Sequence, residues 1–237
     1  MSNKPNIVVL TGAGISAESG IKTFRDADGL WEQYDVMEVA SIGGWARNPS
    51  LVLEFYNQRR RQLLEVKPNQ AHFSLSDLQN YADVTIITQN IDDLHERAGS
   101  NGVVHLHGEL LSVRSEIDSN LVYRWTGDLK MGQCASDGAQ LRPDIVWFGE
   151  MVPKIPEAEV LVANADFLMV IGTSLQVYPA AGLVAAASMA TPIFYIDPNP
   201  GNFYALPNPK LLTLIRTPAT SGVDIATKQI LNNLNLI

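Results

Sequence analysis

The stretch GAGISAESGIKTFRDADGLW, residues 12–31, follows a short apolar run, IVVL, at residues 7–10. Gly12, Gly14 and Ala17 match the pattern Gly-x-Gly-x-x-Gly/Ala, which marks dinucleotide-binding loops when it follows a strand. Glycines let the backbone turn tightly and approach a pyrophosphate, and the start of the next helix attracts anions. The pattern predicts a dinucleotide site, although a plain tight turn between a strand and a helix fits the same residues.

Apolar runs of strand length alternate with helical patterns along the rest of the chain. Continuously apolar strands are typical of a parallel sheet that is buried on both faces. Their alternation with helices predicts an α/β fold with a doubly wound parallel sheet. Strands are expected at residues 6–10, 84–88, 103–106, 144–148, 166–171, 192–196 and 211–216, and helices at residues 50–66, 70–81, 91–98, 156–163, 179–190 and 223–234.

Two long stretches interrupt this alternation. Residues 29–81 are rich in helical patterns, and residues 109–141 are polar with short strands at most. We expect them to pack together as a smaller domain built from two insertions. The expected division is a larger domain of residues 1–29, 82–108 and 142–237, and a smaller domain of residues 30–81 and 109–141.

The composition restricts the classes of partner. The 237 residues carry a formal net charge of −8 and no long basic run, which argues against nucleic acid as a partner. The apolar stretches are too short to span a bilayer, and no signal-peptide pattern precedes the first expected strand. A single cysteine, Cys134, excludes an internal disulfide. We expect a cytoplasmic monomer with no membrane partner.

Polar residues gather in the segment TQNIDDLHERAG, residues 88–99, directly after an expected strand. Gln89, Asn90 and Asp92 would lie at a carboxyl strand end, where open α/β sheets bind ligands. A second interpretation is that Asn90 caps the next helix, with Asp92 and Asp93 in its first turn.

Two histidines occur in the segment HLHGE, residues 105–109. His105 and His107 would point to the same face of a strand, and a histidine at a strand end can exchange a proton near neutral pH. A metal site would need a third ligand, which the segment does not supply.

A dehydrogenase is the first enzyme class that the glycine loop suggests, but its other features are missing. A second strand that ends in an acidic residue should follow after about twenty residues, and residues 32–40 do not form a convincing strand. No tyrosine is followed four residues later by lysine, which is the proton-relay pair of one large dehydrogenase class.

Six motifs, in this order along residues 12–180, resemble the sirtuins, the NAD-dependent protein lysine deacylases: GAGISAESGI, TFR, TQNIDDLHERAG, HGE, VWFGE and GTSLQVYPA. The resemblance continues to the segment IDPN at residues 196–199. It implies a Rossmann-like domain with a smaller domain made from two insertions, in agreement with the pattern above. It also implies that NAD is consumed as a co-substrate rather than reduced.

The resemblance assigns a role to individual residues. It implies that Asn90, Ile91 and Asp92 form the nicotinamide pocket, and that Gln89 contacts the adjoining ribose. The remaining expected contacts to NAD are Gly12, Ala13, Gly14, Ser16, Phe24, Arg25 and Trp31 around the pyrophosphate and ribose, and Gly172, Thr173, Ser174, Asp197, Pro198, Asn199 and Val223 around the adenosine half.

The implied reaction transfers an acyl group from a lysine side chain to ADP-ribose. The acyl oxygen attacks the ribose carbon that nicotinamide leaves, with Asn90 and Asp92 in the pocket. His107 then acts as the general base. The products are free lysine, nicotinamide and an O-acyl-ADP-ribose. The substrate peptide is expected to pair as an added strand with the backbone of the segment that contains Val146, Phe148, Gly149 and Glu150.

The sequence departs from the family pattern after the His-Gly-Glu motif. Most relatives carry two Cys-x-x-Cys pairs there, which form a tetrahedral zinc site. The matching stretch here begins SVRSEIDS, and only Cys134 remains. We therefore expect no bound zinc and a small domain that is held by packing and hydrogen bonds. A degraded, less stable module is the alternative.

The segment LVLEFYNQRRRQLL, residues 51–64, adds an unusual feature to a helical pattern. Arg59 lies on the apolar face, Arg60 on its flank, and Arg61 points away. Two interpretations of Arg59 are open. The aliphatic part of its side chain packs while its guanidinium reaches solvent, or Arg59 and Tyr56 together bind an anion. Tyr56 and Arg59 resemble the signature of the sirtuin subclass that removes malonyl, succinyl and glutaryl groups, and the small Ala27 fits its wider acyl pocket.

The resemblance therefore predicts a deacylase that prefers succinyl or malonyl groups and has weaker activity on acetyl groups. Its protein partners would be proteins with acylated lysine side chains. A catalytically impaired sensor of NAD or ADP-ribose with the same fold is the alternative, because lost cysteines can mark decay.

Overall fold

The computed structural model describes residues 4–22, 30–31, 34–201 and 206–236. A parallel sheet of six strands forms its larger unit, in the order β11-β10-β9-β1-β4-β5. The strands are β1 (Asn6–Thr11), β4 (Asp83–Thr88), β5 (Val103–His105), β9 (Phe167–Ile171), β10 (Ile193–Ile196) and β11 (Leu212–Ile215). The apolar run of β1 is fully buried between β4 and β9, with which it pairs along most of its length. The predicted α/β fold with a doubly wound parallel sheet is confirmed.

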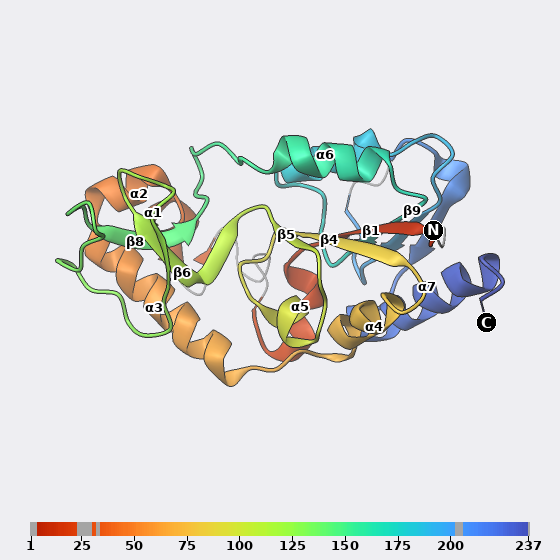
Figure 1. Ribbon diagram of the computed structural model, residues 1–237, viewed down its shortest axis with the longest axis horizontal. Coiled ribbons are helices and arrows are strands. Elements are labelled where there is room, and N and C mark those ends of the chain that lie inside the picture. Colours follow the sequence, from red (N-terminus) through yellow and green to blue (C-terminus); the bar gives the residue numbers. More distant parts are fainter. Residues whose placement is uncertain (1–3, 23–29, 32–33, 202–205, 237) are drawn as a thin grey trace.

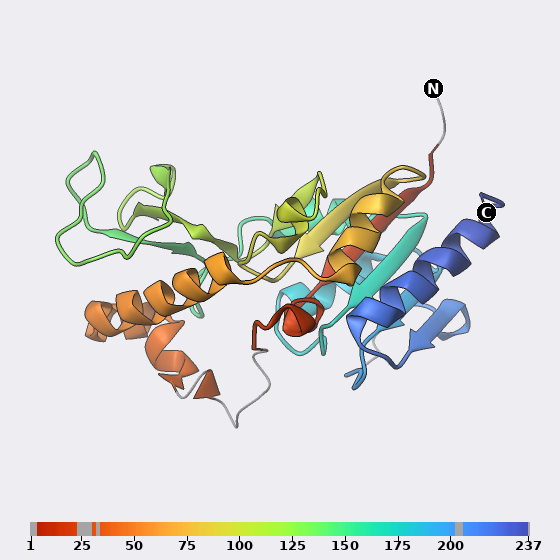
Figure 2. The ribbon, with the colours of Figure 1, turned by 90° about the horizontal axis from the view of Figure 1, so that it is seen from below.

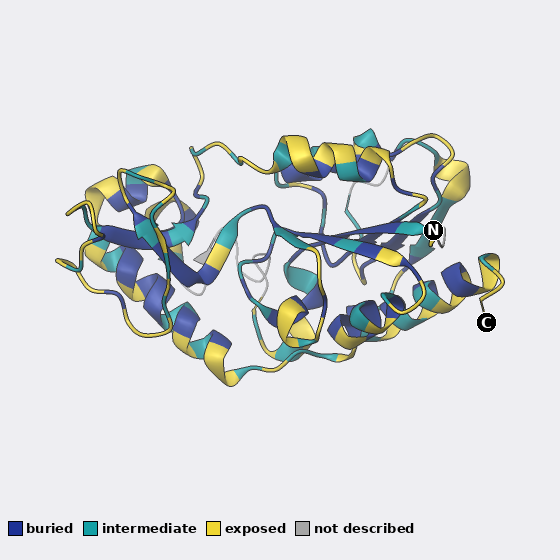
Figure 3. Cartoon of the chain, viewed as in Figure 1, coloured by how far each residue is buried: buried dark blue, intermediate teal, exposed yellow. Residues whose placement is uncertain are grey.

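Helices cover both faces of this sheet (Figure 1). One face packs on α4 (Gln70–Leu78) and α7 (Ala219–Asn233), and the other on α6 (Ile155–Ala163) and the 3-10 helix η3 (Ala180–Ala186). The strands are therefore buried, and the outer sides of the helices face solvent (Figure 3). Short elements lie in the connections: η1 (Ala13–Ile15), η2 (Ala17–Ser19), α5 (Leu94–Arg97) and η4 (Pro209–Leu211).

A smaller unit lies beside the sheet along the long axis of the molecule, as both Figure 1 and Figure 2 show. It consists of a three-stranded antiparallel sheet, helices that pack against it, and a short hairpin. The sheet contains β7 (Val122–Arg124), β6 (Gly108–Ser115) and β8 (Leu141–Ile145); the helices are α1 (Val36–Val39), α2 (Ile42–Arg47) and α3 (Pro49–Glu65); the hairpin is β2 (Leu30–Trp31) with β3 (Tyr34–Asp35). A separate hydrophobic cluster joins α3 to β6 and β8.

Two elements lie in a different unit from the one expected. The strand expected at residues 144–148 overlaps β8 only at residues 144–145, and β8 pairs antiparallel with β6 in the small sheet. The helix expected at residues 70–81 is α4, which packs on the large sheet beside α7. We therefore propose that the boundaries between the two units lie near residues 66–69 and 146, rather than at 81/82 and 141/142.

Hydrogen bonds organise the polar segment between β6 and β8. The Gln140 amide donates to the carbonyl oxygens of Gln133, at 3.1 Å, and Leu141, at 2.9 Å. The Ser115 hydroxyl donates to the Asp137 carboxylate at 2.6 Å, and this bond lowers the pKa of Asp137. These side chains tie the two ends of the segment together.

Cys134 is exposed in this segment. Within the described ranges, no three or more His, Cys, Asp or Glu side chains are grouped so that they could hold a metal ion. Likewise, no helix in those ranges is long and apolar enough to cross a membrane.

Candidate active site at the carboxyl edge of the sheet

The carboxyl ends of the parallel strands form the edge at which most of the predicted site residues meet. The first strand, β1, lies inside the sheet. The strands that follow first extend the sheet on one side of β1, as β4 and β5, and then on its other side, as β9, β10 and β11, so the strand order reverses at β1. Open α/β sheets bind ligands at such a reversal of strand order, outside the carboxyl ends of the strands. The loops that follow β1, β4 and β9 start at this point.

The glycine loop after β1 touches the loop after β9. The N–H of Gly12 donates to the Ile171 carbonyl at 3.0 Å, and the N–H of Gly14 donates to the Gly172 carbonyl at 2.8 Å. A Cβ atom on Gly14 would lie 2.6 Å from Gly172 Cα, and Gly172 itself has a φ of +60°. The glycines are therefore needed for the contact between these two loops, in addition to any role toward a cofactor.

Asn90, Ser16 and Asp92 form a buried hydrogen-bonded group where the β1 and β4 loops meet. The Asn90 amide donates to the Gly12 carbonyl and to the Ser16 hydroxyl, both at 3.2 Å, and the Ser16 hydroxyl donates to Asp92 at 3.0 Å. Asn90 thus turns toward the glycine loop and does not cap α5, whose N-cap is Asp93. The amide and carboxyl groups form a polar pocket wall between two loops.

Burial changes the acidity of this group. The Asp92 side chain is removed from solvent, and this burial raises the pKa of Asp92 from 3.8 to about 6, against the hydrogen bonds from Leu94 and Ser16 that lower it. Next to it, Gln89 links three loops, since its amide donates to Thr173 Oγ1 at 3.1 Å and to the Thr11 carbonyl at 3.3 Å.

His107 lies between β5 and β6, with Nδ1 2.9 Å from the Gln89 carbonyl oxygen. A carbonyl oxygen only accepts, so Nδ1 carries the hydrogen and Nε2 presents its lone pair. Burial lowers the pKa of His107, with an opposing effect from the bond to Gln89. The imidazole is therefore neutral at neutral pH and able to take a proton.

The residues expected around an adenosine lie on the β9 and β10 side of the same edge. Thr173 and Asp197 are buried, and Asp197 accepts a hydrogen bond from the Asn199 N–H at 2.7 Å. Gly172 and Ser174 flank Thr173, while Pro198 and Asn199 are exposed. Val223 is fully buried in the hydrophobic cluster that α7 forms with this sheet.

The segment expected to pair with a substrate peptide, residues 146–150, is already partly paired. The N–H of Val146 donates to the His107 carbonyl at 3.0 Å. Phe148 bonds through both its N–H and its carbonyl to residues 40–42, next to helix α2.

Glu150 and Trp147 organise this segment, and Trp147 was not among the residues predicted from the sequence. The Glu150 carboxylate receives a bidentate bond from Arg142, at 2.7 and 3.0 Å, and a third bond from the Trp147 N–H. The Trp147 ring donates to the Tyr56 hydroxyl at 2.9 Å, and the Arg142 guanidinium lies 3.5 Å from the centre of that ring. The tryptophan inside the motif VWFGE was the only sequence signal for this contact.

Arg59 lines a small hollow of about 40 Å³ between the two units. The same hollow is lined by Asp92 and Ile91 from the β4 loop, and by Ile21, Gln62, Leu63 and Leu110. The Arg59 guanidinium lies 5.0 Å from the centre of the Phe55 ring. Tyr56 is only 1% exposed and is bonded to Trp147 instead, so among the described residues it does not line the hollow.

The arginine that is fully buried on α3 is Arg60, which the sequence pattern placed on the flank of the apolar face. It is 1% exposed and donates to the Leu110 carbonyl, to Asn57 Oδ1 and to the Gly127 carbonyl. Strand β6 and residues 125–129 cover this flank and supply backbone acceptors, which the helical pattern could not indicate. Arg59 is half-buried.

Three of the expected site residues, Phe24, Arg25 and Ala27, lie outside the described residues, and for Trp31 only the backbone is described.

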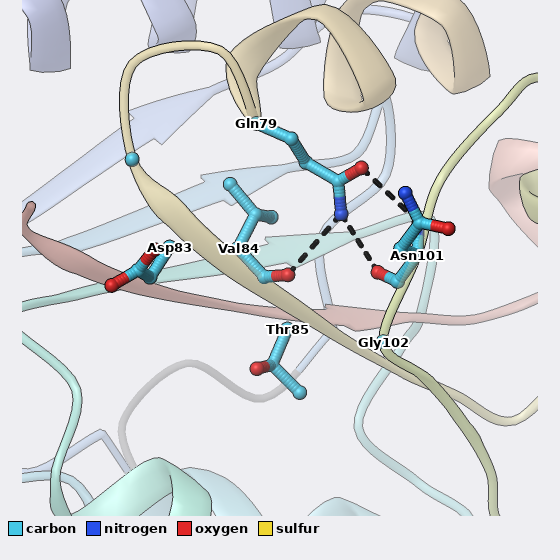
Figure 4. A pocket seen from close by; sticks show the side chains of 7 residues that line it. Gln79, Asp83, Val84, Thr85, Asn101 and Gly102 are labelled. Carbon is cyan, nitrogen blue, oxygen red and sulfur yellow. Dashed lines mark hydrogen bonds between the residues drawn. The ribbon is translucent and has the colours of Figure 1, made fainter.

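A second hollow lies at the opposite, amino end of β4, lined by residues that include Val84, Thr85 and Gly102 (Figure 4). Gln79 is one of its lining residues and forms hydrogen bonds to the Val84 and Asn101 carbonyls and from the Asn101 N–H. None of the predicted site residues lines it.

Comparison with known proteins identifies the class to which this site belongs. Residues 12–179 match the model of the Sir2 family. Two curated relatives are each named NAD-dependent protein deacylase. The one from Helicobacter pylori is 66% identical over 197 residues, 83% of this chain and 86% of the relative. The one from Bacteroides thetaiotaomicron is 51% identical over 225 residues, which cover 92% of this chain and 95% of the relative. A solved structure described as a complex of a Sir2 homolog with NAD is 37% identical, with a TM-score of 0.85 over 98% of this chain and 91% of that one. The chain belongs to the Sir2 family.

Proposed function

We propose that this protein removes acyl groups from lysine side chains of proteins with NAD as co-substrate, and that it prefers acyl chains that end in a carboxylate. The coarser activity follows from its family: the chain is an NAD-dependent protein deacylase. The preference for an acidic acyl chain rests on one observation, which is that Arg59 lines the same hollow as Asp92.

The residues at the sheet edge fit NAD by their chemistry. The Asn90–Ser16–Asp92 group offers amide, hydroxyl and carboxyl groups in a buried setting, where hydrogen bonds to a bound amide or ribose are not lost to water. When bound, NAD supplies a ribose carbon that becomes electrophilic as nicotinamide leaves. Asp92 holds the nicotinamide end and the buried pocket excludes water.

His107 accepts the proton in this proposal. Its Nε2 lone pair is available because Nδ1 is fixed by the Gln89 carbonyl. Because burial lowers the pKa of His107, the base stays deprotonated at neutral pH. The proton would come from a ribose hydroxyl, whose oxygen would then bond to the acyl carbon. That carbon would release the lysine amine, and one water molecule would supply the hydroxyl left on the ribose carbon. The acyl group would remain on ADP-ribose.

Arg59 recognises the far end of the acyl chain in this proposal. A carboxylate that enters an apolar hollow requires a charged or hydrogen-bonding partner, and a guanidinium offers two parallel donors to it. Ile91, Leu63 and Leu110 provide the apolar walls. Burial raises the pKa of Tyr56 well above its usual value, so its hydroxyl keeps its hydrogen while it accepts the bond from Trp147.

The test is turnover of matched acetyl-, malonyl- and succinyl-lysine peptides with NAD, with products measured by mass. Truncating one partner of a buried charge pair costs about 2–5 kcal/mol, so Arg59→Met should lower kcat/KM for succinyl-lysine by roughly 30- to 3000-fold. Activity on acetyl-lysine should change little or rise. Tyr56→Phe should change the preference less than Arg59→Met, because it removes only the acceptor of the Trp147 bond outside the hollow.

Arg61→Met is the matched control on the same helix. Arg61 is half-exposed and pairs with Glu54 and Asp128 on the surface, so its loss should leave the acyl preference unchanged. Equal damage to succinyl and acetyl turnover in Arg59→Met would assign Arg59 to the fold rather than to the substrate. Binding of NAD without nicotinamide release from any peptide would instead support a sensor.

We also propose that the protein acts in the cytoplasm as a monomer and binds neither nucleic acid nor membrane. The net charge of −8 supports the absence of nucleic acid and membrane partners, because it repels both phosphate backbones and anionic lipid surfaces.

A further inference from the structure

His105 lies at the carboxyl end of β5 and is only 6% exposed. Its two ring nitrogens each meet an oxygen atom. Nε2 lies 2.7 Å from Glu96 Oε1 of α5, and Nδ1 lies 3.2 Å from the Asn90 carbonyl oxygen. The ring therefore bridges helix α5 and the loop that carries Asn90 and Asp92.

Both partners of His105 are acceptors. A backbone carbonyl has no hydrogen to give, and an ionised carboxylate has none either. Both contacts are hydrogen bonds only if each ring nitrogen carries a hydrogen, which makes the ring an imidazolium cation. His107, two residues later, meets a single acceptor and keeps a lone pair. The two histidines are thus set in opposite protonation states by their partners.

The charges around His105 agree with this assignment. Burial works against its charge, but the hydrogen bond and the charge of Glu96 outweigh burial and raise the pKa of His105. Glu109 on β6 contributes in the same direction. Asp92 faces it from the β4 loop, and the positive charge of His105 lowers the pKa of Asp92. Among the described residues His95 on α5 also interacts with His105, and burial lowers the pKa of His95, so it stays neutral.

The Asn90 backbone is fixed from both sides. Its N–H donates to Thr88 Oγ1 at 3.0 Å, and its carbonyl accepts from His105. One residue later, the Ile91 carbonyl accepts from the Leu110 N–H at 2.8 Å. With the peptide planes on each side held, the Asn90 side chain is directed at the glycine loop.

We propose that His105, held as a cation by Glu96, is a positioning residue for the cleavage of NAD: it fixes the Asn90 carbonyl and so orients Asn90 and Asp92. This inference rests on the proposed deacylase function. It also accounts for both ring nitrogens of His105, which leaves no lone pair for a metal ion and argues against a metal pair with His107.

The first test is the pH profile of kcat/KM for NAD, measured by nicotinamide release with a saturating acyl-peptide. Glu96→Gln keeps an oxygen acceptor but removes the charge, so His105 should lose its proton at a lower pH. The alkaline limb should move to lower pH by about one unit or more, the usual size of an effect from one opposite charge. The acid limb should stay in place, because neither His107 nor Asp92 takes its pKa shift from Glu96.

Glu109→Gln is the graded control, because Glu109 is exposed and acts on His105 through charge without a hydrogen bond. It should move the alkaline limb in the same direction by a smaller amount. A Glu96→Gln profile that is lower at every pH but unchanged in shape would overturn the inference, since a purely structural role predicts that result.

The second test needs only the wild-type protein. In protein labelled with ¹⁵N-histidine, His105 should show two protonated ring nitrogens at neutral pH, while His107 shows one. A neutral His105 at that pH would overturn the inference even if the Glu96 variant did not fold. Absence of nicotinamide release from the wild type with any acyl-peptide would instead refute the proposed function, and leaves the NMR result to decide the protonation of His105.

Discussion

Burial acts on His107 and Asp92 in opposite directions for the same physical reason. Low polarity disfavours the charged form of each group, so burial lowers the pKa of the histidine and raises that of the carboxyl group. Near neutral pH, this leaves His107 as a neutral base and Asp92 as an acid close to its titration range. Burial thus shifts the pKa values of the two groups toward each other's range and suits each group to a different task.

Replacement of His107 should abolish turnover and leave the fold intact. We expect His107→Ala to lower deacylation by roughly two to four orders of magnitude, the usual contribution of a positioned base. Binding of NAD, measured by calorimetry, should remain close to that of the wild type. Rates near the wild-type value would remove His107 from the mechanism.

Asp92 should reduce stability at neutral pH because its charge is buried. Its pKa is about 6 in the folded protein and 3.8 otherwise, so the folded state holds the extra proton between these values and stability falls as pH rises through them. We expect Asp92→Asn to stabilise the fold at pH 7.5 by up to about 3 kcal/mol. The same variant should lose deacylase activity.

The pH dependence of this gain provides the control. Near pH 3.5 the wild-type carboxyl group is itself protonated, so the melting temperatures of Asp92→Asn and the wild type should converge there. A gain of equal size at both pH values would point to packing rather than to charge.

At the scale of the elements, the segment between β6 and β8 should hold its shape without a metal. Structural zinc normally needs four ligands, whereas Gln140 and the Ser115–Asp137 pair tie this segment through hydrogen bonds. Metal analysis should find well under one zinc per chain, because a full structural site would bind one. A chelator should change neither the melting temperature nor the rate.

Substitutions in the same segment distinguish a segment that is held by hydrogen bonds from one that is held by a metal. Gln140→Leu should lower the melting temperature, because several backbone groups lose their partner at once. Cys134→Ser should have no effect, since Cys134 is exposed. Stoichiometric zinc, or a large effect of Cys134→Ser, would contradict a module held by hydrogen bonds.

The sequence predicted the positions of the strands in the large sheet well, but it did not indicate which strands pair with each other. The strands at β1, β4, β9 and β10 were predicted to within one residue, because each is a continuous apolar run. The apolar run at residues 145–148 looks the same in sequence, yet only Ile145 lies in a strand, and that strand, β8, pairs with β6 in the small sheet. An apolar run indicates burial, and it does not indicate which sheet supplies the neighbouring strand.

The same limit applies to the candidate site. Motifs indicated the loops that carry Asn90, Asp92 and His107, because polar residues at strand ends form a local pattern. The link from Trp147 to Tyr56 joins residues 91 positions apart, and the burial of Arg60 depends on backbone carbonyls of other segments. Contacts of this kind depend on tertiary packing that helical periodicity does not contain.

At the scale of the whole molecule, the position of β1 inside the sheet has a consequence for folding during synthesis. The neighbours of β1 are β4 and β9, which begin at residues 83 and 167. A growing chain therefore exposes the apolar segment NIVVLT on both edges until β4 emerges, and on one edge until about 170 residues have been made. Long-range parallel pairing is slow, and unpaired apolar strands aggregate. The strand that starts the active-site loop is thus left without one of its two neighbours for most of synthesis.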